Sequence, residues 1–216
     1  MKSTPPENTR EKWLTYPATH PYETLFARTP QTRNVWVVFH GIGFLSRYFL
    51  RYFTHLDPKE NYVIAPQAPS LYYLDAEYRN VGASWLTREH TREHMANLLN
   101  YLDVLSLGES LDTAPNLILM GYSQGVSVLC RWVALKKVRC SRLVLYAGKV
   151  PRELTPADFS HLGRETRVEA FAGRSDPFLE NNRTGEYDRL ETLFPGNLVL
   201  TEYEGGHELL RDYIRA

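Results

Sequence analysis

The chain is poor in cysteine and carries no excess of charge of either sign. Its 216 residues include two cysteines, Cys130 and Cys140, which are too few for a disulfide framework and form no metal-ligand pattern. We expect both to be buried, reduced thiols. Lysine plus arginine total 25 and aspartate plus glutamate total 25, so the formal net charge is zero. This balance gives no electrostatic reason to expect a nucleic acid or an anionic membrane as a partner, and it favours small neutral ligands.

Long apolar runs are also missing. Residues 1–8 lack the apolar core of a secretory signal peptide, and no later run approaches the length of a membrane-spanning helix. We therefore expect a soluble, cytoplasmic protein without a membrane span. Residues 1–20 are polar and punctuated by proline, which predicts an N-terminal arm, and residues 21–216 are long enough for a single domain. The sequence leaves monomer and homodimer open.

Predicted strands and helices alternate along this domain. Apolar, β-rich runs predict strands at residues 23–28, 35–39, 62–65, 116–120, 142–146, 167–172 and 198–203. Apolar residues at helical spacing predict helices at residues 46–55, 87–106, 126–133, 186–194 and 208–216. Because parallel neighbours need crossovers, the alternation predicts an α/β fold with a mostly parallel central sheet and helices on both faces. Loops are expected at residues 67–73 and 149–163, the latter leaving room only for a minimal lid.

Residues 116–125 carry the strongest functional signal. An apolar run of strand length leads into the motif G-x-S-x-G at residues 121–125, and a helical pattern follows. This context is typical of a nucleophile elbow, a tight turn that exposes a serine hydroxyl, here that of Ser123. The turn is so crowded that only glycine fits at positions 121 and 125. The following helix directs its N-terminal N–H groups at the serine, so the backbone of Gln124 is a candidate oxyanion donor.

Three other turns follow predicted strands and complete a candidate site. Asp176 and His207 each lie in a loop just after a strand, and loops after parallel strands share one edge of the sheet. With Ser123 they predict a triad in the chain order nucleophile, acid, base. The small-residue turn at residues 40–43 can bring a second backbone N–H beside the serine, and Ile42 is the candidate.

Apolar side chains near these loops suggest a hydrophobic acyl pocket. The candidate substrate-binding residues are Phe44, Tyr72, Trp85, Phe178 and Leu179. Aromatic packing of a long loop explains Tyr72 and Trp85 almost as well. The aromatic residues at positions 48, 49, 52 and 53 have helical spacing and are predicted to lie in the core.

Residues 90–94 offer a competing interpretation. His90-Thr91-Arg92-Glu93-His94 matches H-x-x-E-H, a zinc-protease pattern in which two histidines one helical turn apart hold a metal. The match is short, lies in a very polar helix start and lacks a third ligand. A solvated, salt-bridged helix face accounts for it better, so no metal is expected at these residues.

Together these motifs resemble those of the α/β-hydrolase fold, and specifically of the small serine esterases of the phospholipase/carboxylesterase and acyl-protein thioesterase group. The matching segments are residues 40–43, 121–125, 173–177 and 205–207, which span nearly the whole predicted domain. The resemblance implies that Ser123 is the nucleophile, that Asp176 orients His207, and that the oxyanion donors are Ile42 and Gln124. The glutamine after the serine is the most family-specific feature.

The implied activity is a cofactor-independent carboxylesterase that cleaves esters of small to medium apolar acyl groups through an acyl-enzyme. Two departures concern the substrate. Phe44 stands where thioesterase members usually have an acidic residue, and residues 71–85 match their substrate loop only loosely. The alternatives are therefore a thioesterase or another acyl hydrolase, and a non-catalytic protein that keeps the hydrolase cavity for ligand binding.

Overall fold

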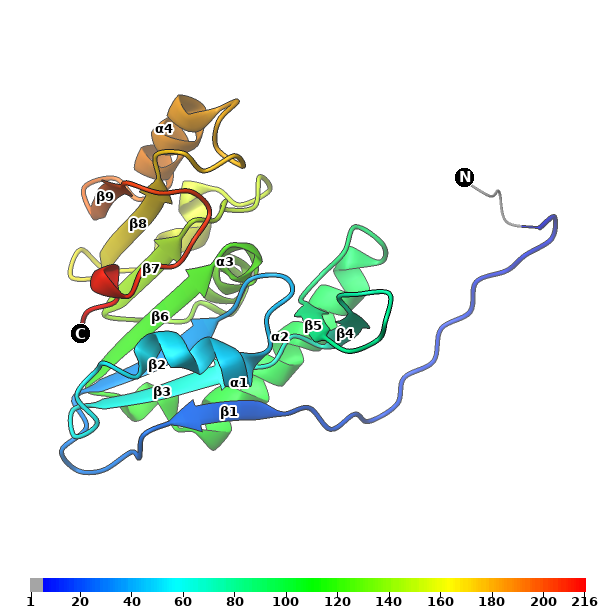
Figure 1. Cartoon of the computed structure of the whole chain (residues 1–216), viewed down its shortest axis with the longest axis horizontal. Helices are drawn as coiled ribbons and strands as arrows, with labels where there is room; N and C mark the ends of the chain where they lie inside the picture. The colour runs from blue at the N-terminus through cyan, green and yellow to red at the C-terminus, as the bar shows by residue number, and fades with distance from the viewer. Residues whose placement is uncertain (1–5) are drawn as a thin grey trace.

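The structure, a computed structural model, describes residues 6–216, which fold around one mostly parallel β-sheet (Figure 1). Its seven strands lie in the order β1, β3, β2, β6, β7, β8, β9. Their bounds are β1 Tyr22–Leu25, β2 Asn34–Phe39, β3 Asn61–Pro66, β6 Asn116–Tyr122, β7 Arg142–Tyr146, β8 Arg167–Gly173 and β9 Leu198–Tyr203. Strand β1 is antiparallel to β3, and the other pairs of this sheet are parallel. The predicted α/β class with a mostly parallel sheet is confirmed.

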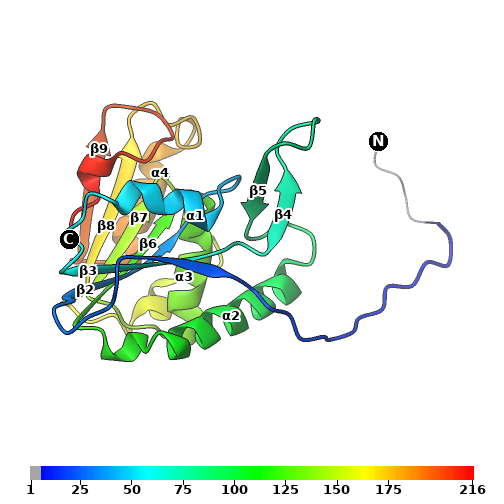
Figure 2. The same cartoon turned by 60° about the horizontal axis from the view of Figure 1, so that its bottom comes forward.

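Helices cover both faces of the sheet (Figure 2). The α-helices are α1 Ser46–Phe49, α2 Thr91–Gly108, α3 Gln124–Lys136 and α4 Arg183–Leu193. The 3-10 helices are η1 Leu50–Phe53, η2 Leu111–Thr113, η3 Pro156–Phe159 and η4 Arg211–Tyr213. Helices α2 and α3 lie on one face, and α1 lies with the C-terminal segment on the other. The prediction of helices on both faces is confirmed. Within residues 6–216, no helix has the length and apolarity that crossing a bilayer requires.

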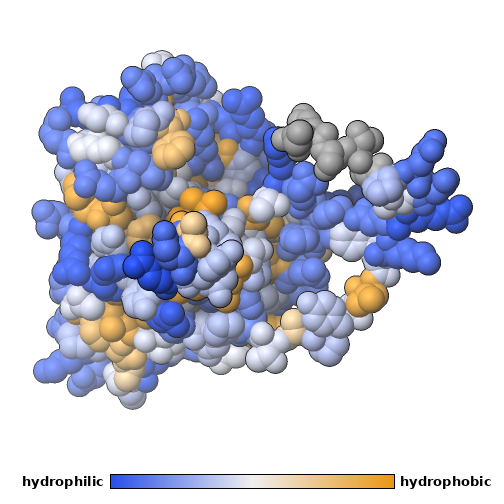
Figure 3. Space-filling view, turned by 45° about the vertical axis from the view of Figure 1, so that its right-hand side comes forward, coloured by the Kyte–Doolittle hydropathy of each residue, from blue (hydrophilic) through white to orange (hydrophobic). Residues whose placement is uncertain are grey.

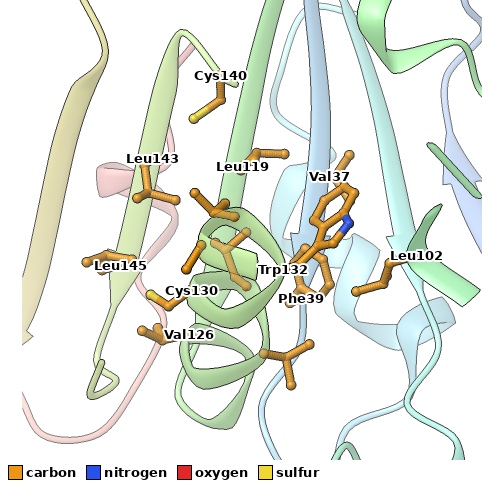
Figure 4. Packing of buried hydrophobic residues seen from close by; sticks show 14 of the residues in the cluster. Val37, Phe39, Leu102, Leu119, Val126, Cys130, Trp132, Cys140, Leu143 and Leu145 are labelled. Atoms are coloured by element: carbon orange, nitrogen blue, oxygen red, sulfur yellow. The ribbon is translucent and has the colours of Figure 1, made fainter. Parts of the chain in front are cut away.

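The sheet separates two apolar cores. Along β2, Val37 and Phe39 point into the first core, beneath α2 and α3, whereas Trp36 points into the second core, beneath α1. Alternate residues are thus buried on opposite faces, which explains why β2 is a continuous apolar run. Figure 4 shows Phe39 facing Trp132 of α3, and the two ring centroids are 5.9 Å apart.

Both cysteines are buried and free of disulfide bonds, as predicted. Cys130 packs within α3 in the first core, and Cys140 lies just before β7 in the same core (Figure 4). Burial raises the pKa of each thiol to about 12, so both stay protonated at neutral pH.

Two predicted helices are present with different bounds. The helix predicted at residues 46–55 is a four-residue α-helix that continues as the 3-10 helix η1. The helix predicted at residues 87–106 begins only at Thr91, because His90 has a φ of 49° and its left-handed conformation ends the helix on that side.

The prediction of a helix at residues 208–216 is wrong. Only the short 3-10 helix η4 forms there. Leu209 and Ile214 are both buried in the second core, and their separation along the chain does not fit one face of an α-helix. Tertiary contacts hold the segment instead, since His55 Nε2 lies 2.8 Å from the carbonyl oxygen of Ile214 and the N–H of Leu210 donates to the hydroxyl of Tyr146.

A β-hairpin replaces the loop predicted at residues 67–73. Its strands, β4 Ser70–Tyr73 and β5 Val81–Ser84, pair antiparallel outside the main sheet. The hairpin projects from the body beside helix α1 and the N-terminal end of α2 (Figure 2). Strands of four residues, one of which contains Gly82, carry too little apolar alternation to be predicted from sequence.

Residues 6–20 contain no helix or strand, and the segment extends away from the sheet (Figures 1 and 3). Trp13, Leu14 and Tyr16 are exposed there, and Figure 3 shows hydrophobic atoms along this stretch. Near the start of α2, Glu11 and Trp13 contact His90. Residues 1–5 of the predicted arm lie outside the described residues.

The first core makes a testable prediction through Leu119, a fully buried residue of β6. Leu119→Ala removes apolar contacts and leaves a cavity, so the free energy of unfolding should fall by about 2–5 kcal/mol in urea denaturation. Leu135→Ala, at a position of α3 that is 53% exposed, is the matched control and should change it by less than about 0.5 kcal/mol. Equal losses in the two variants would contradict this burial pattern.

Candidate active site

Ser123 occupies a strained turn between β6 and α3. Its φ of 53° and ψ of −119° lie outside the conformations that non-glycine residues ordinarily adopt. The N–H of Ser123 donates to the carbonyl oxygen of Tyr146 at 2.9 Å, and its own carbonyl accepts from the N–H of Val126 at 3.1 Å. These bonds fix the turn so that the hydroxyl stands clear of both elements.

Glycine is required on both sides of this turn, as the sequence predicts. A Cβ on Gly121 would lie 2.7 Å from the backbone of Val126. A Cβ on Gly125 would lie 2.2 Å from the carbonyl oxygen of Phe39. Either contact is far inside van der Waals distance, so α3 can approach β2 and β6 this closely only without side chains at these positions.

The three predicted triad residues meet at one edge of the sheet. His207 Nε2 lies 2.8 Å from Ser123 Oγ, and His207 Nδ1 lies 2.8 Å from Asp176 Oδ2. Asp176 follows β8 and is 1% exposed, and His207 follows the neighbouring strand β9. The N–H of Phe178 donates to Asp176 Oδ1 at 2.9 Å and leaves Oδ2 to the imidazole. A neutral imidazole protonated at Nδ1 donates to Asp176 and accepts the Ser123 proton at Nε2.

Aromatic rings hold the imidazole of His207 from two sides. The ring of Tyr122 stacks on it, with centroids 5.5 Å apart and planes at 29°. The ring of Phe178 meets it edge-on, with centroids 4.6 Å apart. The hydroxyl of Tyr122 also donates to the carbonyl oxygen of His207 at 3.0 Å, so the ring and the backbone of His207 are both fixed.

The two predicted oxyanion donors lie on either side of a switch in strand order. After β2 the chain crosses to β3 on one side, and β6 then returns to pair with β2 on the other. Ligands of open α/β sheets bind at such switch points. Ile42 follows β2 and its N–H has no acceptor among residues 6–216, while Gln124 is the first residue of α3, where no intrahelical acceptor exists.

His40 holds the turn that carries Ile42. The side chain is fully buried, and Nδ1 lies 2.8 Å from the carbonyl oxygen of Gly41. Its Nε2 accepts from the N–H of Ala68 at 3.2 Å. Burial lowers the pKa of His40 to about 4, so the ring is neutral and can both donate and accept. This role is not predicted from the sequence, although a histidine directly after a buried strand is a usable signal.

Ser123 and His207 open into a cavity of about 430 Å³. Its other lining residues are Gly41, Ile42, Phe44, Tyr52, Tyr122, Phe178, Glu208 and Leu209. Phe44 and Phe178 therefore lie where the sequence predicts substrate-binding residues. Tyr52 and Leu209 were missed, Tyr52 because its helical spacing suggested the core and Leu209 because it falls in the wrongly predicted C-terminal helix.

Three predicted pocket residues lie elsewhere among the described residues, and each position is a correction. Trp85 is fully buried between Phe39 and His40 rather than lining the cavity. Leu179 is buried and lines a separate cavity of about 20 Å³. Tyr72 belongs to the hairpin strand β4, outside the cavity wall. These residues were predicted to lie at the site because they are apolar, but the packing of the strands decides which side chains reach it.

Residues 90–94 do not assemble into a metal centre. His90 Nε2 lies 3.1 Å from the carboxylate of Glu11, and both side chains are largely exposed. Within residues 6–216, no group of three or more His, Cys, Asp or Glu side chains could hold a metal ion.

His40 predicts a pH dependence of stability. The folded pKa of about 4 lies below the ordinary value of 6.5, so between these values the unfolded state binds more protons. Stability is therefore complete above a pH of about 6.5 and is lost as the pH falls toward 4. Between these pH values, wild type should lose up to about 3 kcal/mol more than His40→Asn, measured by urea denaturation across a pH series. Parallel stability curves for the two proteins would contradict the assignment.

Comparison with solved structures identifies the fold. A carboxylesterase from Mesorhizobium loti superposes with a TM-score of 0.65 at 15% identity, covering 88% of each chain. Acyl-protein thioesterase 2 from Zea mays gives 0.64 at 16% identity, covering 90% of this chain and 94% of its own. A phospholipase/carboxylesterase from Dyadobacter fermentans gives 0.62 at 14% identity, covering 92% and 94%.

The likeness concerns architecture, because the identities are low. No protein-family model matches this sequence, and no curated protein sequence does either. The chain has the α/β-hydrolase fold, as the resemblance of its motifs implies.

Proposed function

We propose that this α/β-hydrolase-fold protein is a serine carboxylesterase that hydrolyses esters of small to medium apolar acyl groups. The observation that carries the proposal is the hydrogen-bonded chain from Ser123 through His207 to the buried Asp176, which opens into a cavity. Such a chain of hydrogen bonds activates a hydroxyl for nucleophilic attack. A serine that only packed in the core would not require the strained backbone that Ser123 has.

In the proposed acylation step, Oγ of Ser123 attacks the ester carbonyl carbon while its proton moves to His207 Nε2. The carbonyl oxygen becomes an oxyanion that the N–H groups of Ile42 and Gln124 stabilise. Asp176 keeps the imidazole in the correct tautomer and stabilises the imidazolium. His207 then gives the proton to the leaving alkoxide, and an acyl-enzyme remains on Ser123.

Deacylation repeats the same transfers with water as the nucleophile. His207 removes a proton from the water that attacks the acyl-enzyme, and the second oxyanion uses the same two N–H donors. Collapse of this intermediate returns the proton to Ser123 and releases the carboxylic acid. All groups in the scheme come from this one chain, so a second copy is not needed to complete the site.

The cavity wall supports an apolar acyl group. Phe44, Tyr52 and Leu209 present aromatic and aliphatic surface, and the one charged side chain on the wall apart from the triad is Glu208. A carboxylate without a lysine or arginine beside it in the wall favours uncharged substrates over anionic ones. The volume of about 430 Å³ is at the lower end of small-molecule sites, which suits short and medium chains.

We place this esterase in the cytoplasm. Cys130 and Cys140 are both free and buried, and proteins of reducing compartments commonly keep their thiols in this state.

The central test of the proposal is Ser123→Ala. It should abolish labelling by a fluorophosphonate probe and lower ester turnover by about 10⁴-fold or more, because the nucleophile is lost. Ser141→Ala, at an exposed position before β7, is the matched control and should label and turn over like wild type. Equal labelling of wild type and Ser123→Ala, or none in either folded protein, would contradict the proposal and favour a non-catalytic ligand-binding protein.

The same assay separates ester from thioester preference. A chain-length series of p-nitrophenyl esters is compared with thioesters of the same acyl groups. Esters should give the higher kcat/KM, whereas consistently higher values for the thioesters would make the chain a thioesterase.

Phe44 provides a test of the acyl pocket. Phe44→Ala should reduce kcat/KM for p-nitrophenyl hexanoate relative to the acetate by about tenfold, because the longer chain loses apolar contact. Tyr48→Ala, at an exposed position of the same segment, should leave this ratio within about twofold of wild type. An equal loss for both esters in Phe44→Ala would show that Phe44 does not contact the acyl chain.

A further inference from the structure

Residues 82–86, at the end of β5 and just beyond it, form a segment that we call the strap. The strap is bonded to both ends of the turn that carries Ile42. The N–H of Gly43 donates to the carbonyl oxygen of Ala83 at 2.8 Å, and Trp85 Nε1 donates to the carbonyl oxygen of His40 at 2.8 Å. The position of the Ile42 N–H therefore depends on the position of the strap.

The side chain of Gln124 is also hydrogen-bonded to the strap. Its Oε1 accepts from the N–H of Trp85 at 2.9 Å, and its Nε2 donates to the carbonyl oxygen of Leu86 at 2.8 Å and to Ser84 Oγ at 3.1 Å. The strap thus presents both an N–H donor and oxygen acceptors to one side chain. A primary amide satisfies both at once, which a carboxylate or an ammonium group cannot do.

Tight packing leaves the strap little freedom. A Cβ on Gly82 would lie 2.6 Å from the carbonyl oxygen of Gly43. Trp85 is fully buried, with its ring centroid 4.9 Å from that of His40. A displacement of the strap would therefore move the turn at residues 40–43 with it.

We propose that the side chain of Gln124 is a positioning group that sets the spacing of the oxyanion hole through the strap. The two N–H donors come from different elements, Ile42 from the turn after β2 and Gln124 from the start of α3. The Gln124 amide links those elements by a short hydrogen-bonded path. This inference rests on the proposed esterase function and explains why the residue that supplies a backbone donor is a glutamine.

A merely structural role makes a different prediction. Loss of a bond that only adds stability lowers the free energy of unfolding and leaves the chemistry of the folded protein unchanged. Loss of a positioning bond instead weakens binding of the transition state more than binding of the substrate, because the oxyanion exists only during reaction. The two roles are therefore separated by comparing kcat with KM, and by inhibitors that do or do not form an oxyanion.

The main variant is Gln124→Met, which keeps the backbone N–H and the side-chain volume but removes the bonds to the strap. We expect kcat to fall by about 10- to 100-fold while KM changes less than about threefold. A trifluoromethyl ketone, which Ser123 attacks to form an oxyanion adduct, should lose affinity by the same factor as kcat/KM. The corresponding alcohol, which forms no adduct, should bind as it does to wild type.

Gly82→Ala is an independent variant, because the added Cβ pushes the strap from Gly43 without touching Gln124. It should show the same pattern of kcat, KM and inhibitor affinities. Gln31→Met, at an exposed turn position, is the matched control and should behave as wild type. Unfolding measurements on each variant confirm that the folded protein is assayed.

Amide hydrogen exchange tests the strap without requiring turnover. In Gln124→Met, the N–H groups of Trp85 and Gly43 should exchange at least about tenfold faster than in wild type, because both depend on the strap. If wild type hydrolyses no ester, the proposed function fails, and the exchange rates alone decide whether Gln124 holds the strap. Folded Gln124→Met with unchanged kcat and ketone affinity, or with unchanged exchange at both amides, would overturn the proposal.

Discussion

The backbone at Ser123 is held in a conformation that costs a non-glycine residue of the order of 1–3 kcal/mol. It persists because the surrounding strands leave no alternative. The N–H of Ser123 is bonded to Tyr146 of β7, and Gly125 lies against the carbonyl oxygen of Phe39 at the end of β2. Strands β2, β6 and β7 must therefore be correctly paired before the serine hydroxyl can face the imidazole of His207. Packing of the two cores maintains this pairing and so maintains the strained turn.

Once the sheet is formed, residues far apart in the chain become neighbours. His207 is 84 positions from Ser123 and 31 from Asp176, yet both hydrogen bonds of its ring measure 2.8 Å. Parallel strands produce this arrangement because their carboxyl ends share one edge. Rings of Tyr122 and Phe178 then fix the imidazole, and the strap at residues 82–86 connects the turn after β2 with the start of α3. The candidate site is thus held in place by contacts within the chain itself, as electrostatic stabilisation of an oxyanion requires.

The residues of this site that can be predicted from the sequence are those that short sequence patterns mark. The motif at residues 121–125 identifies Ser123, and the loops after two strands identify Asp176 and His207, because parallel strands end at one edge. The location of Trp85 shows what short sequence patterns cannot predict. Its apolar ring is compatible with a pocket wall or with the core, and only the tertiary packing around Phe39 decides for the core. The β4–β5 hairpin was missed for the same reason, since strands of four residues depend on contacts that the local sequence does not show.

The proposed mechanism requires Ser123 to be an activated nucleophile that carries the acyl group between the two half-reactions. The most direct measurement is rapid mixing of the protein with a p-nitrophenyl ester, acid quenching within the first turnover, and mass mapping of the modified peptide. We expect a burst of p-nitrophenolate of about one equivalent per active chain, with the acyl group on Ser123. Release of product with no acylated peptide, or an acyl group found only on another residue, would contradict it.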